Sequence, residues 1–270
     1  MQAVQQTWDA ADYAANSAVQ AGWGRELIGR LALRGDEQVL DIGCGDGRLT
    51  AQLAARLPAG AVLGIDASAA MQALATEHWG DGVRLTFRQM DAQAIHAAAD
   101  LAGRFDVVFS TSALHWVADH PAVLTGVRHS LRRGGRLWLQ TAAVGNCAAV
   151  LTAAEQVCAA PRWRDRFAGF SHPWRFCAQS DYARWLPQAG LRPDRLAIVR
   201  RSVWHAGAEA LSGWLRTTWL PYLTRLPAAE QADFVAALVA AYLHHVPTDA
   251  AGRIPVEMVR LEVVATLANE

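Results

Sequence analysis

One ten-residue segment, VLDIGCGDGR at residues 39–48, constrains the fold of this chain more than any other. It opens with an apolar run typical of a buried strand and then has a glycine at every second position. From Leu49 onward, apolar residues recur at helical spacing, at Leu53 and Leu57. A strand, a glycine turn and a helix in this order bring backbone N–H groups close to a ligand, and a Cβ would block both the tight turn and the ligand's approach. The segment therefore predicts a ligand-binding turn at the end of a strand.

The spacing of the glycines indicates which ligand the turn suits. Gly43, Gly45 and Gly47 read G-x-G-x-G, whereas a dinucleotide turn reads G-x-G-x-x-G and would need glycine at Arg48. This spacing argues against a nucleotide-dependent oxidoreductase. A second apolar run, residues 61–66, ends in Asp66, nineteen residues after Gly47. A carboxylate there can accept hydrogen bonds from both ribose hydroxyls of an adenosine group.

The glycine turn and the spaced acid resemble the first two motifs of the class I S-adenosylmethionine-dependent methyltransferases, and the resemblance covers nearly the whole chain. It implies that the turn holds the methionine end of the cofactor, that Asp66 takes the ribose hydroxyls, and that Asp91 with Ala92 lies near the adenine amino group. Met71 is expected beside the ribose or adenine, although helix packing explains it equally well, and Cys44 is expected to be a small filler. The residues predicted to contact the cofactor are Tyr13, Asp41, Gly43, Cys44, Gly45, Gly47, Asp66, Ala67, Met71, Asp91, Ala92 and Ser110.

The rest of the chain alternates strands with helices. Apolar segments at residues 39–42, 61–66, 83–87, 105–109 and 137–139 predict five strands, and Ser68 is a predicted helix N-cap. Such a pattern is typical of an α/β, doubly wound, Rossmann-like parallel sheet with its ligand crevice at the carboxyl ends of the strands. Residues 196–199 predict a sixth strand, and residues 256–263 alternate apolar and charged side chains. By resemblance, this last segment closes a seven-stranded sheet as an antiparallel strand.

Helical spacing recurs outside the sheet pattern. Residues 7–31 predict one or two helices, residues 211–226 a helix kinked by Pro221, and residues 234–242 another helix. By resemblance, helices between the sixth and seventh strands form a mainly helical cap over the crevice. The predicted domains are N-terminal lid helices (1–35), a cofactor-binding core (36–141), a cap insertion (142–190), core strands (191–204 and 253–270) and a helical cap (205–252).

Composition excludes several function classes. The chain has 25 basic and 25 acidic residues among its 270, so no excess of positive charge favours nucleic acid. No apolar run reaches the ~18 residues needed to span a membrane. The four cysteines form no C-x-x-C pair and suit a reducing compartment, so we expect a cytoplasmic protein. No cluster has metal-ligand spacing. Composition leaves the oligomeric state open.

The segment after the fourth strand, residues 110–116, bears on the acceptor of the methyl group. It lacks the Asn/Asp-Pro-Pro-Tyr/Phe motif of enzymes that methylate base amines, and no Pro-Cys nucleophile is present. It resembles the Leu-His/Gln-Trp stretch of the trans-aconitate and juvenile hormone acid methyltransferases. Tyr13 and Gln20 match the Tyr-x6-Gln pattern of the latter, in which the glutamine and the tryptophan hold the substrate's carboxylate. Carried over, these residues are Gln20 and Trp116, whose amide and indole N–H groups can grip a carboxylate without neutralising it.

These observations predict a small-molecule methyltransferase that O-methylates a carboxylic acid and releases S-adenosylhomocysteine. A sulfonium methyl group is already activated, so holding the attacking atom in line supplies much of the catalysis, and a general base is not required. The predicted catalytic residues are Gln20, His115 and Trp116. His115 is either a base, which would suit N- or C-methylation of a secondary metabolite, or a wall residue. A cyclase or non-catalytic partner that binds the same cofactor is a further alternative.

Overall fold

The computed structural model describes residues 18–268, which form two compact units. The first unit takes in the described residues up to Val144, residues 174–199, and the residues from Arg260 onward. The second unit takes in residues 145–173 and 200–259. The chain thus divides at other points than the predicted domain boundaries, which remain predictions.

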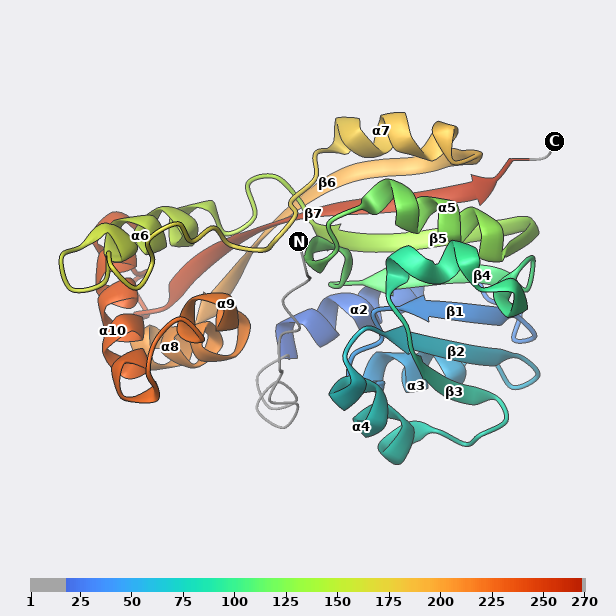
Figure 1. Cartoon of the computed structure of the whole chain (residues 1–270), viewed down its shortest axis with the longest axis horizontal. Helices are drawn as coiled ribbons and strands as arrows, with labels where there is room; N and C mark the ends of the chain where they lie inside the picture. The colour runs from blue at the N-terminus through green and yellow to red at the C-terminus, as the bar shows by residue number, and fades with distance from the viewer. Residues whose placement is uncertain (1–17, 269–270) are drawn as a thin grey trace. The chain divides into compact units, whose positions relative to one another are not determined.

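A seven-stranded sheet is the centre of the fold, in the order β3-β2-β1-β4-β5-β7-β6 (Figure 1). Strands β1 to β5 pair in parallel, and β7 runs antiparallel to β5. This arrangement confirms the doubly wound sheet and its antiparallel closing strand. The strands are β1 (Gln38–Ile42), β2 (Ala61–Asp66), β3 (Leu85–Gln89), β4 (Phe105–Thr111), β5 (Leu131–Ala142), β6 (Leu191–His205) and β7 (Ile254–Leu267).

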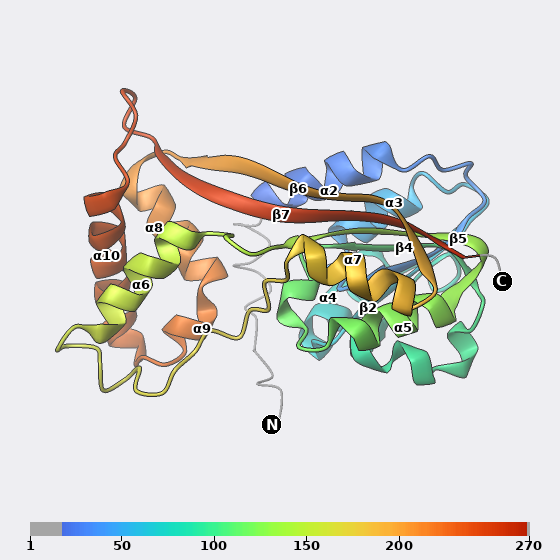
Figure 2. The same cartoon turned by 90° about the horizontal axis from the view of Figure 1, so that it is seen from above.

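Helices cover both faces of the sheet in the first unit. Figure 2 shows α2 and α3 on one face and α5 and α7 on the opposite face. The helices of this unit are α2 (Ala18–Arg30), α3 (Arg48–Ala54), α4 (Ala69–Trp79), α5 (His120–Ser130) and α7 (Gln179–Gln188), with short 3-10 helices η1 (Ala92–Ala97), η2 (Ala99–Leu101) and η3 (Leu114–Trp116). The apolar face of α2 packs into a buried cluster with α3 and the strands, which fixes the helix beside the glycine turn. This cluster comprises Leu27, Ile28, Leu31, Val39, Leu53, Leu57, Val62, Leu85, Val107 and Phe109.

Two details of the sheet region depend on side-chain capping of the backbone. The hydroxyl oxygen of Ser68 accepts the N–H of Met71 at 3.3 Å, which confirms Ser68 as the N-cap of α4. Strand β3 begins at Leu85 rather than at the predicted Val83. The carboxylate of Asp81 accepts the backbone N–H groups of Val83 and Leu85, each at 2.8 Å, and so holds this segment in a turn that leaves Val83 exposed.

The second unit is mainly helical and has its own aromatic core. It contains α6 (Ala148–Ala159), α8 (Gly207–Thr218), α9 (Leu220–Leu223) and α10 (Ala228–His245). The ring of Phe167 stacks on that of Phe234 with centroids 5.1 Å apart. The prediction of one helix kinked at Pro221 is wrong, because α8 ends at Thr218 and Pro221 lies in the first turn of a separate helix. A proline is well tolerated there, since the first helical turn has no intrahelical partner for its missing N–H.

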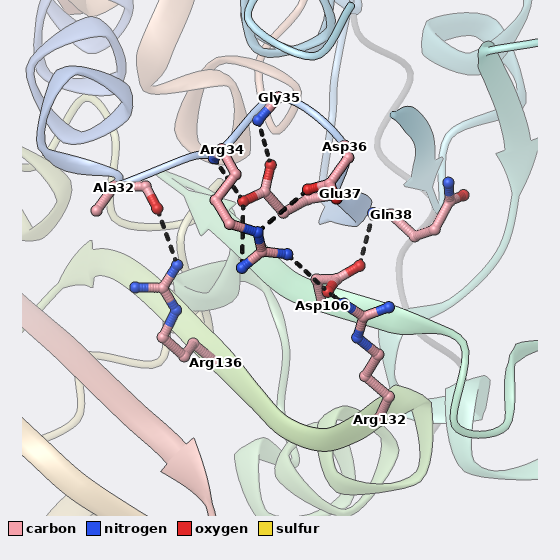
Figure 3. A network of polar contacts seen from close by, with 9 residues as sticks. All are labelled: Ala32, Arg34, Gly35, Asp36, Glu37, Gln38, Asp106, Arg132 and Arg136. Carbon is pink, nitrogen blue, oxygen red and sulfur yellow. Dashed lines mark hydrogen bonds and ion pairs between the residues drawn. The ribbon is translucent and has the colours of Figure 1, made fainter. Parts of the chain in front are cut away.

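Charged side chains fix the amino ends of β1 and β4 (Figure 3). Glu37 accepts the backbone N–H groups of Arg34 and of the next residue, at 2.7 and 2.9 Å. Burial would raise the pKa of Glu37, but these two bonds and the charge of Arg34 outweigh it and hold the pKa below its ordinary value. Asp106 accepts the backbone N–H of Gln38 at 2.8 Å and pairs with Arg132 and Arg34. The edge opposite the carboxyl ends of the strands is therefore rigidly held by charge-assisted hydrogen bonds.

Candidate functional site

The glycine turn follows β1 and leads into α3. Gly43, Gly45 and Gly47 all adopt left-handed backbone conformations, with φ of 75°, 55° and 78°. A Cβ on Gly43 would lie 2.2 Å from the Cβ of Ala113, so this glycine is required by packing. A Cβ on Gly45 would meet no atom within 4 Å among the described residues. The middle of the turn is thus the point where a ligand can approach the backbone.

Asp66 joins the end of β2 to this turn. Its two carboxylate oxygens accept backbone N–H groups, one from Gly45 and one from Ser68, each at 2.9 Å. Burial raises the pKa of Asp66, and these two bonds oppose the rise. A carboxylate has about four acceptor positions, so two hydrogen bonds leave capacity for hydroxyl donors. The structure brings Asp66 and the glycine turn together, as the sequence predicts.

Asp41, at the end of β1, and Cys44, within the turn, are both buried. Asp41 is buried, and its carboxylate accepts the hydroxyl of Thr50 at 2.7 Å. Burial raises the pKa of Asp41 to about 7, the bond from Thr50 opposes the rise, and the charge of Asp66 adds to it. Burial likewise raises the pKa of the Cys44 thiol well above its ordinary value, which disfavours the reactive thiolate form. The contact role of both residues remains a prediction, and sequence reasoning missed the brace by Thr50.

The end of β3 meets the end of β2 close to Asp66. The backbone N–H of Met90 donates to the carbonyl of Asp66 at 2.9 Å, which places Asp91 at the same edge of the sheet. The carboxylate of Asp91 caps η1 by accepting the N–H of Gln93 at 2.8 Å. Ala92 and Met71 are buried, whereas Ala67 is exposed.

Ser110 connects β4 to the end of β1. Its hydroxyl is buried and donates to the carbonyl of Ile42 at 2.8 Å. This bond explains a serine here as a cross-strand brace, and its predicted contact with the cofactor remains untested.

An aromatic cluster lies just beyond β4, on η3 and on residues 174–176. The rings of Trp116 and Trp174 meet edge to face with centroids 5.7 Å apart. The ring centroids of His115 and Phe176 are 6.4 Å apart. The backbone N–H of Arg175 donates to the carbonyl of His115 at 2.7 Å and ties the two segments together. Phe176 was missed by sequence reasoning, because nothing in residues 161–178 predicts regular structure.

His115 is kept neutral by its surroundings. Burial, together with the charges of Arg260 and His120, lowers the pKa of His115 to about 3. Its Nδ1 atom is buried and has no hydrogen-bond partner within residues 18–268. The imidazole is therefore uncharged at neutral pH, and one of its ring nitrogens is a buried polar atom that no described residue satisfies.

Arg260 on β7 reaches the same region. The side chain is buried, donates to the hydroxyl of Ser112, and places its guanidinium carbon 4.6 Å from the ring centroid of Trp23 on α2. Ser112 has a left-handed φ of 57°, and its N–H donates to the carbonyl of Gln140 at 2.9 Å. Sequence reasoning missed Arg260, although an arginine between Val259 and Leu261 in an apolar strand was a visible signal.

Of two further predicted residues, one is described only by its backbone and the other is not described. Gln20 lies on α2, one helical turn before Trp23, but its side chain is not among those described. Tyr13 lies outside the described residues. The helix that carries Gln20 is anchored at its other end, where Arg30 donates to both carboxylate oxygens of Glu262 at 2.9 and 3.0 Å.

The described part of the chain lacks two features. Residues 18–268 contain no group of three or more His, Cys, Asp or Glu side chains that could hold a metal ion. None of the helices described there has the length and apolar character needed to cross a membrane.

Comparison with known proteins gives consistent matches. Residues 39–135 match the family described as methyltransferase domain. The chain is 34% identical to a trans-aconitate 2-methyltransferase of Deinococcus radiodurans, covering 85% of this chain and 87% of that protein. It is 32% identical to a trans-aconitate 2-methyltransferase of Methylobacterium nodulans, covering 96% and 97%. Among solved structures, the fold is shared by phosphoethanolamine N-methyltransferase 2 of Haemonchus contortus, which was solved in complex with S-adenosylhomocysteine. The TM-score is 0.61 at 15% sequence identity, and the match covers 96% of this chain and 57% of that one.

Proposed function

Because the chain belongs to the class I S-adenosylmethionine-dependent methyltransferases, we propose that it methylates a carboxylate oxygen of a small-molecule acid. The products are a methyl ester and S-adenosylhomocysteine. The names of the trans-aconitate 2-methyltransferases support an acid as acceptor. The observation that carries the proposal is the position of the His115 ring, which is shielded from solvent so that its pKa is lowered and which lies beside Trp116 with ring centroids 5.6 Å apart.

Acceptors differ in whether they need a base. A hydroxyl, a carbon acceptor or a protonated amine has to lose a proton before or during transfer, whereas a carboxylic acid with a pKa of about 4 is already an anion at neutral pH. A base works best when its pKa lies near the operating pH. The pKa of His115 is lowered to about 3, mainly by burial, so this ring is a weak proton acceptor. The site therefore suits an acceptor that arrives deprotonated.

The turn after β1 fits the cofactor. Gly45 leaves open space where a Cβ would stand, and Asp66 is fixed beside it with capacity to accept ribose hydroxyls. The residues that would hold the cofactor are Tyr13, Asp41, Gly43, Cys44, Gly45, Gly47, Asp66, Ala67, Met71, Asp91, Ala92 and Ser110. When bound, S-adenosylmethionine supplies a methyl group on a positively charged sulfur.

The task of the remaining residues is to orient the acceptor. The indole N–H of Trp116 and the amide N–H of Gln20 would each donate to the acceptor's carboxylate and leave its negative charge available for attack. The edge contact with Trp174 restricts the orientation of the Trp116 ring. Holding the acceptor's carboxylate in line with the methyl group is catalysis by proximity, because it makes a bimolecular reaction effectively unimolecular.

Replacing Trp116 by Phe tests the role of the indole N–H. The W116F variant keeps an aromatic ring but loses the donor, so we expect kcat/KM to fall about tenfold or more, the size of one hydrogen bond to a charged group. The affinity for S-adenosylhomocysteine, measured by calorimetry, should stay within twofold of wild type. W174F serves as a matched control that changes the neighbouring ring. Loss of S-adenosylhomocysteine affinity in W116F would contradict the assignment.

The class of acceptor is tested by the chemistry of the product. S-adenosylmethionine labelled in the methyl group is incubated with the protein and a panel of acids, phenols and amines, with trans-aconitate included. The product is then treated with mild alkali. Label released as methanol identifies a carboxyl methyl ester and supports the proposal. Label retained on the product indicates an ether, amine or carbon acceptor, for which His115 would be the candidate base. If no S-adenosylhomocysteine forms when an acceptor is added, a cyclase or a non-catalytic protein is favoured.

A further inference from the structure

Arg260 is a buried cation that the methyl-transfer scheme above does not use. Its side chain is 5% exposed although it is charged at every accessible pH. Charged side chains are rarely this buried unless they bind something of opposite charge or take part in a polar network. A role in ligand binding would explain its position at the edge of the sheet where the predicted active-site residues gather.

The guanidinium is held in place from two sides. Its N–H donates to the hydroxyl of Ser112, and its guanidinium carbon lies over the ring of Trp23, 4.6 Å from the ring centroid. Ser112 adopts a left-handed φ of 57°, a conformation that non-glycine residues rarely take and that often marks functional sites. The structure thus orients Arg260 rather than leaving a flexible cation.

The nearest acidic residue on the same face of β7 has other partners. Glu262 binds Arg30 at 2.9 Å, Arg195 at 3.3 Å and the amide of Gln140 at 3.2 Å. Removal of Arg195 therefore changes the charge of the same sheet region without touching the contacts of Arg260, which makes Arg195 a suitable control.

We propose that Arg260 binds a carboxylate group of a ligand, at the place where Ser112 and Trp23 hold its guanidinium. A planar guanidinium donates two parallel N–H groups to a carboxylate, so recognition is both strong and oriented. A cation in such contact withdraws charge from the oxygens it binds, which would slow their attack on a methyl group. The bound carboxylate is therefore one that does not react.

Two sources supply such a carboxylate. The first is a second carboxylate of the acceptor, and this source rests on the proposed function. The second is the amino acid carboxylate at the methionine end of the cofactor, and this source rests only on membership of the family. The test has to separate the two.

The variants are R260Q, which removes the charge, and R260K, which keeps the charge but loses the planar fork. R195Q is the matched control. Affinities are measured by calorimetry for S-adenosylhomocysteine, for 5′-methylthioadenosine, which lacks the amino acid group, and for trans-aconitate added to the S-adenosylhomocysteine complex. We expect R260Q to lose about 10- to 100-fold in one affinity, the range for a hydrogen bond to a charged group. R260K should lose less.

Each source has its own signature. If Arg260 binds the acceptor, R260Q weakens trans-aconitate and leaves S-adenosylhomocysteine unchanged. If Arg260 binds the cofactor, R260Q weakens S-adenosylhomocysteine but not 5′-methylthioadenosine. Unchanged affinities in a folded R260Q variant, or equal losses in R195Q, would overturn the proposal.

A second variant covers the case in which R260Q does not fold. S112G removes the hydroxyl that positions Arg260, and glycine accepts the left-handed backbone there without strain. We expect S112G to weaken the same ligand as R260K, by about three- to tenfold. A folded S112G variant with wild-type affinities, together with wild-type affinities in R260K, would equally overturn the proposal. Failure of the methyl ester assay would refute the proposed function while leaving the cofactor arm of this test intact.

Discussion

Glu262 offers the sharpest test of how this fold is held together, through the substitution E262Q. The carboxylate is buried on β7, and it receives N–H donors from Arg30 on α2, Arg195 on β6 and Gln140 on β5. Removing one partner of a buried ion pair typically costs about 3–5 kcal/mol of unfolding free energy. Here the side chains of Arg30 and Arg195 are 35% and 49% exposed and can regain water, and a glutamine retains one acceptor oxygen. We therefore expect E262Q to lower the unfolding free energy by about 2 kcal/mol.

The assay is urea unfolding of E262Q, R30M and the double variant. A coupling energy of about 1 kcal/mol or more between Glu262 and Arg30 is expected, because Nη1 of Arg30 donates to both carboxylate oxygens. E257Q is the matched control, because Glu257 and Arg200 form an exposed pair that should contribute less than about 0.5 kcal/mol. A loss below 0.5 kcal/mol in E262Q, or strict additivity with R30M, would refute the reasoning.

The pH dependence of the same group gives an independent check. Burial would raise the pKa of Glu262, but the hydrogen bonds and charges of Arg30, Gln140 and Arg195 outweigh it and lower the pKa below its ordinary value. The folded state therefore binds this proton more weakly than the unfolded state does. The stabilisation is present above about pH 4.5 and is lost as the pH falls through the lowered pKa. The difference in stability between wild type and E262Q should shrink over that range.

Two further predictions concern the glycine turn and a buried histidine. G45A should fold, at a cost of about 1–2 kcal/mol for its left-handed backbone, and should lose S-adenosylhomocysteine affinity in calorimetry. G43A should lower the thermal unfolding temperature further than G45A does, because its Cβ would meet Ala113. Equal stabilities of the two variants would contradict this prediction. Burial lowers the pKa of His120 to about 4, and its Nδ1 lies 2.7 Å from the hydroxyl of Tyr182. The stabilising contribution of neutral His120 is present above about pH 6.5 and is lost as the pH falls toward 4. The H120Q variant should therefore lose less stability than wild type over this range of pH. An unchanged dependence of stability on pH would refute the assignment.

Local patterns in the sequence were sufficient for most of the sheet. The strand, glycine turn and helix at residues 39–54 are determined by neighbours in the chain, and the end of β2 at Asp66 follows from its apolar run. The left-handed backbone at all three glycines agrees with the absence of side chains there. These are features in which short-range periodicity and turn chemistry point to one answer.

The acceptor side of the site depended on contacts that spacing does not reveal. Arg260 and Ser112 are 148 residues apart in sequence and meet only because β7 inserts next to β5. The segment that carries Phe176 has no regular structure, so no periodicity marks its approach to His115. Pro221 was read as a kink because a proline inside a helical stripe and a proline in the first turn of a new helix have the same pattern of apolar neighbours.

The pairing of β7 with β5 has a consequence for how this chain can change over time. Arg260 stands opposite Ala142 in the antiparallel register, and side chains alternate between the two faces along a strand. Insertion or deletion of one residue within β7 would exchange Arg260 and Leu261 across the sheet and carry the cation away from Ser112. The connection at residues 246–253, between α10 and β7, is free of this constraint. Between α10 and the end of β7, length variation among descendants is therefore expected in that connection, whereas β7 itself is expected to change by substitution.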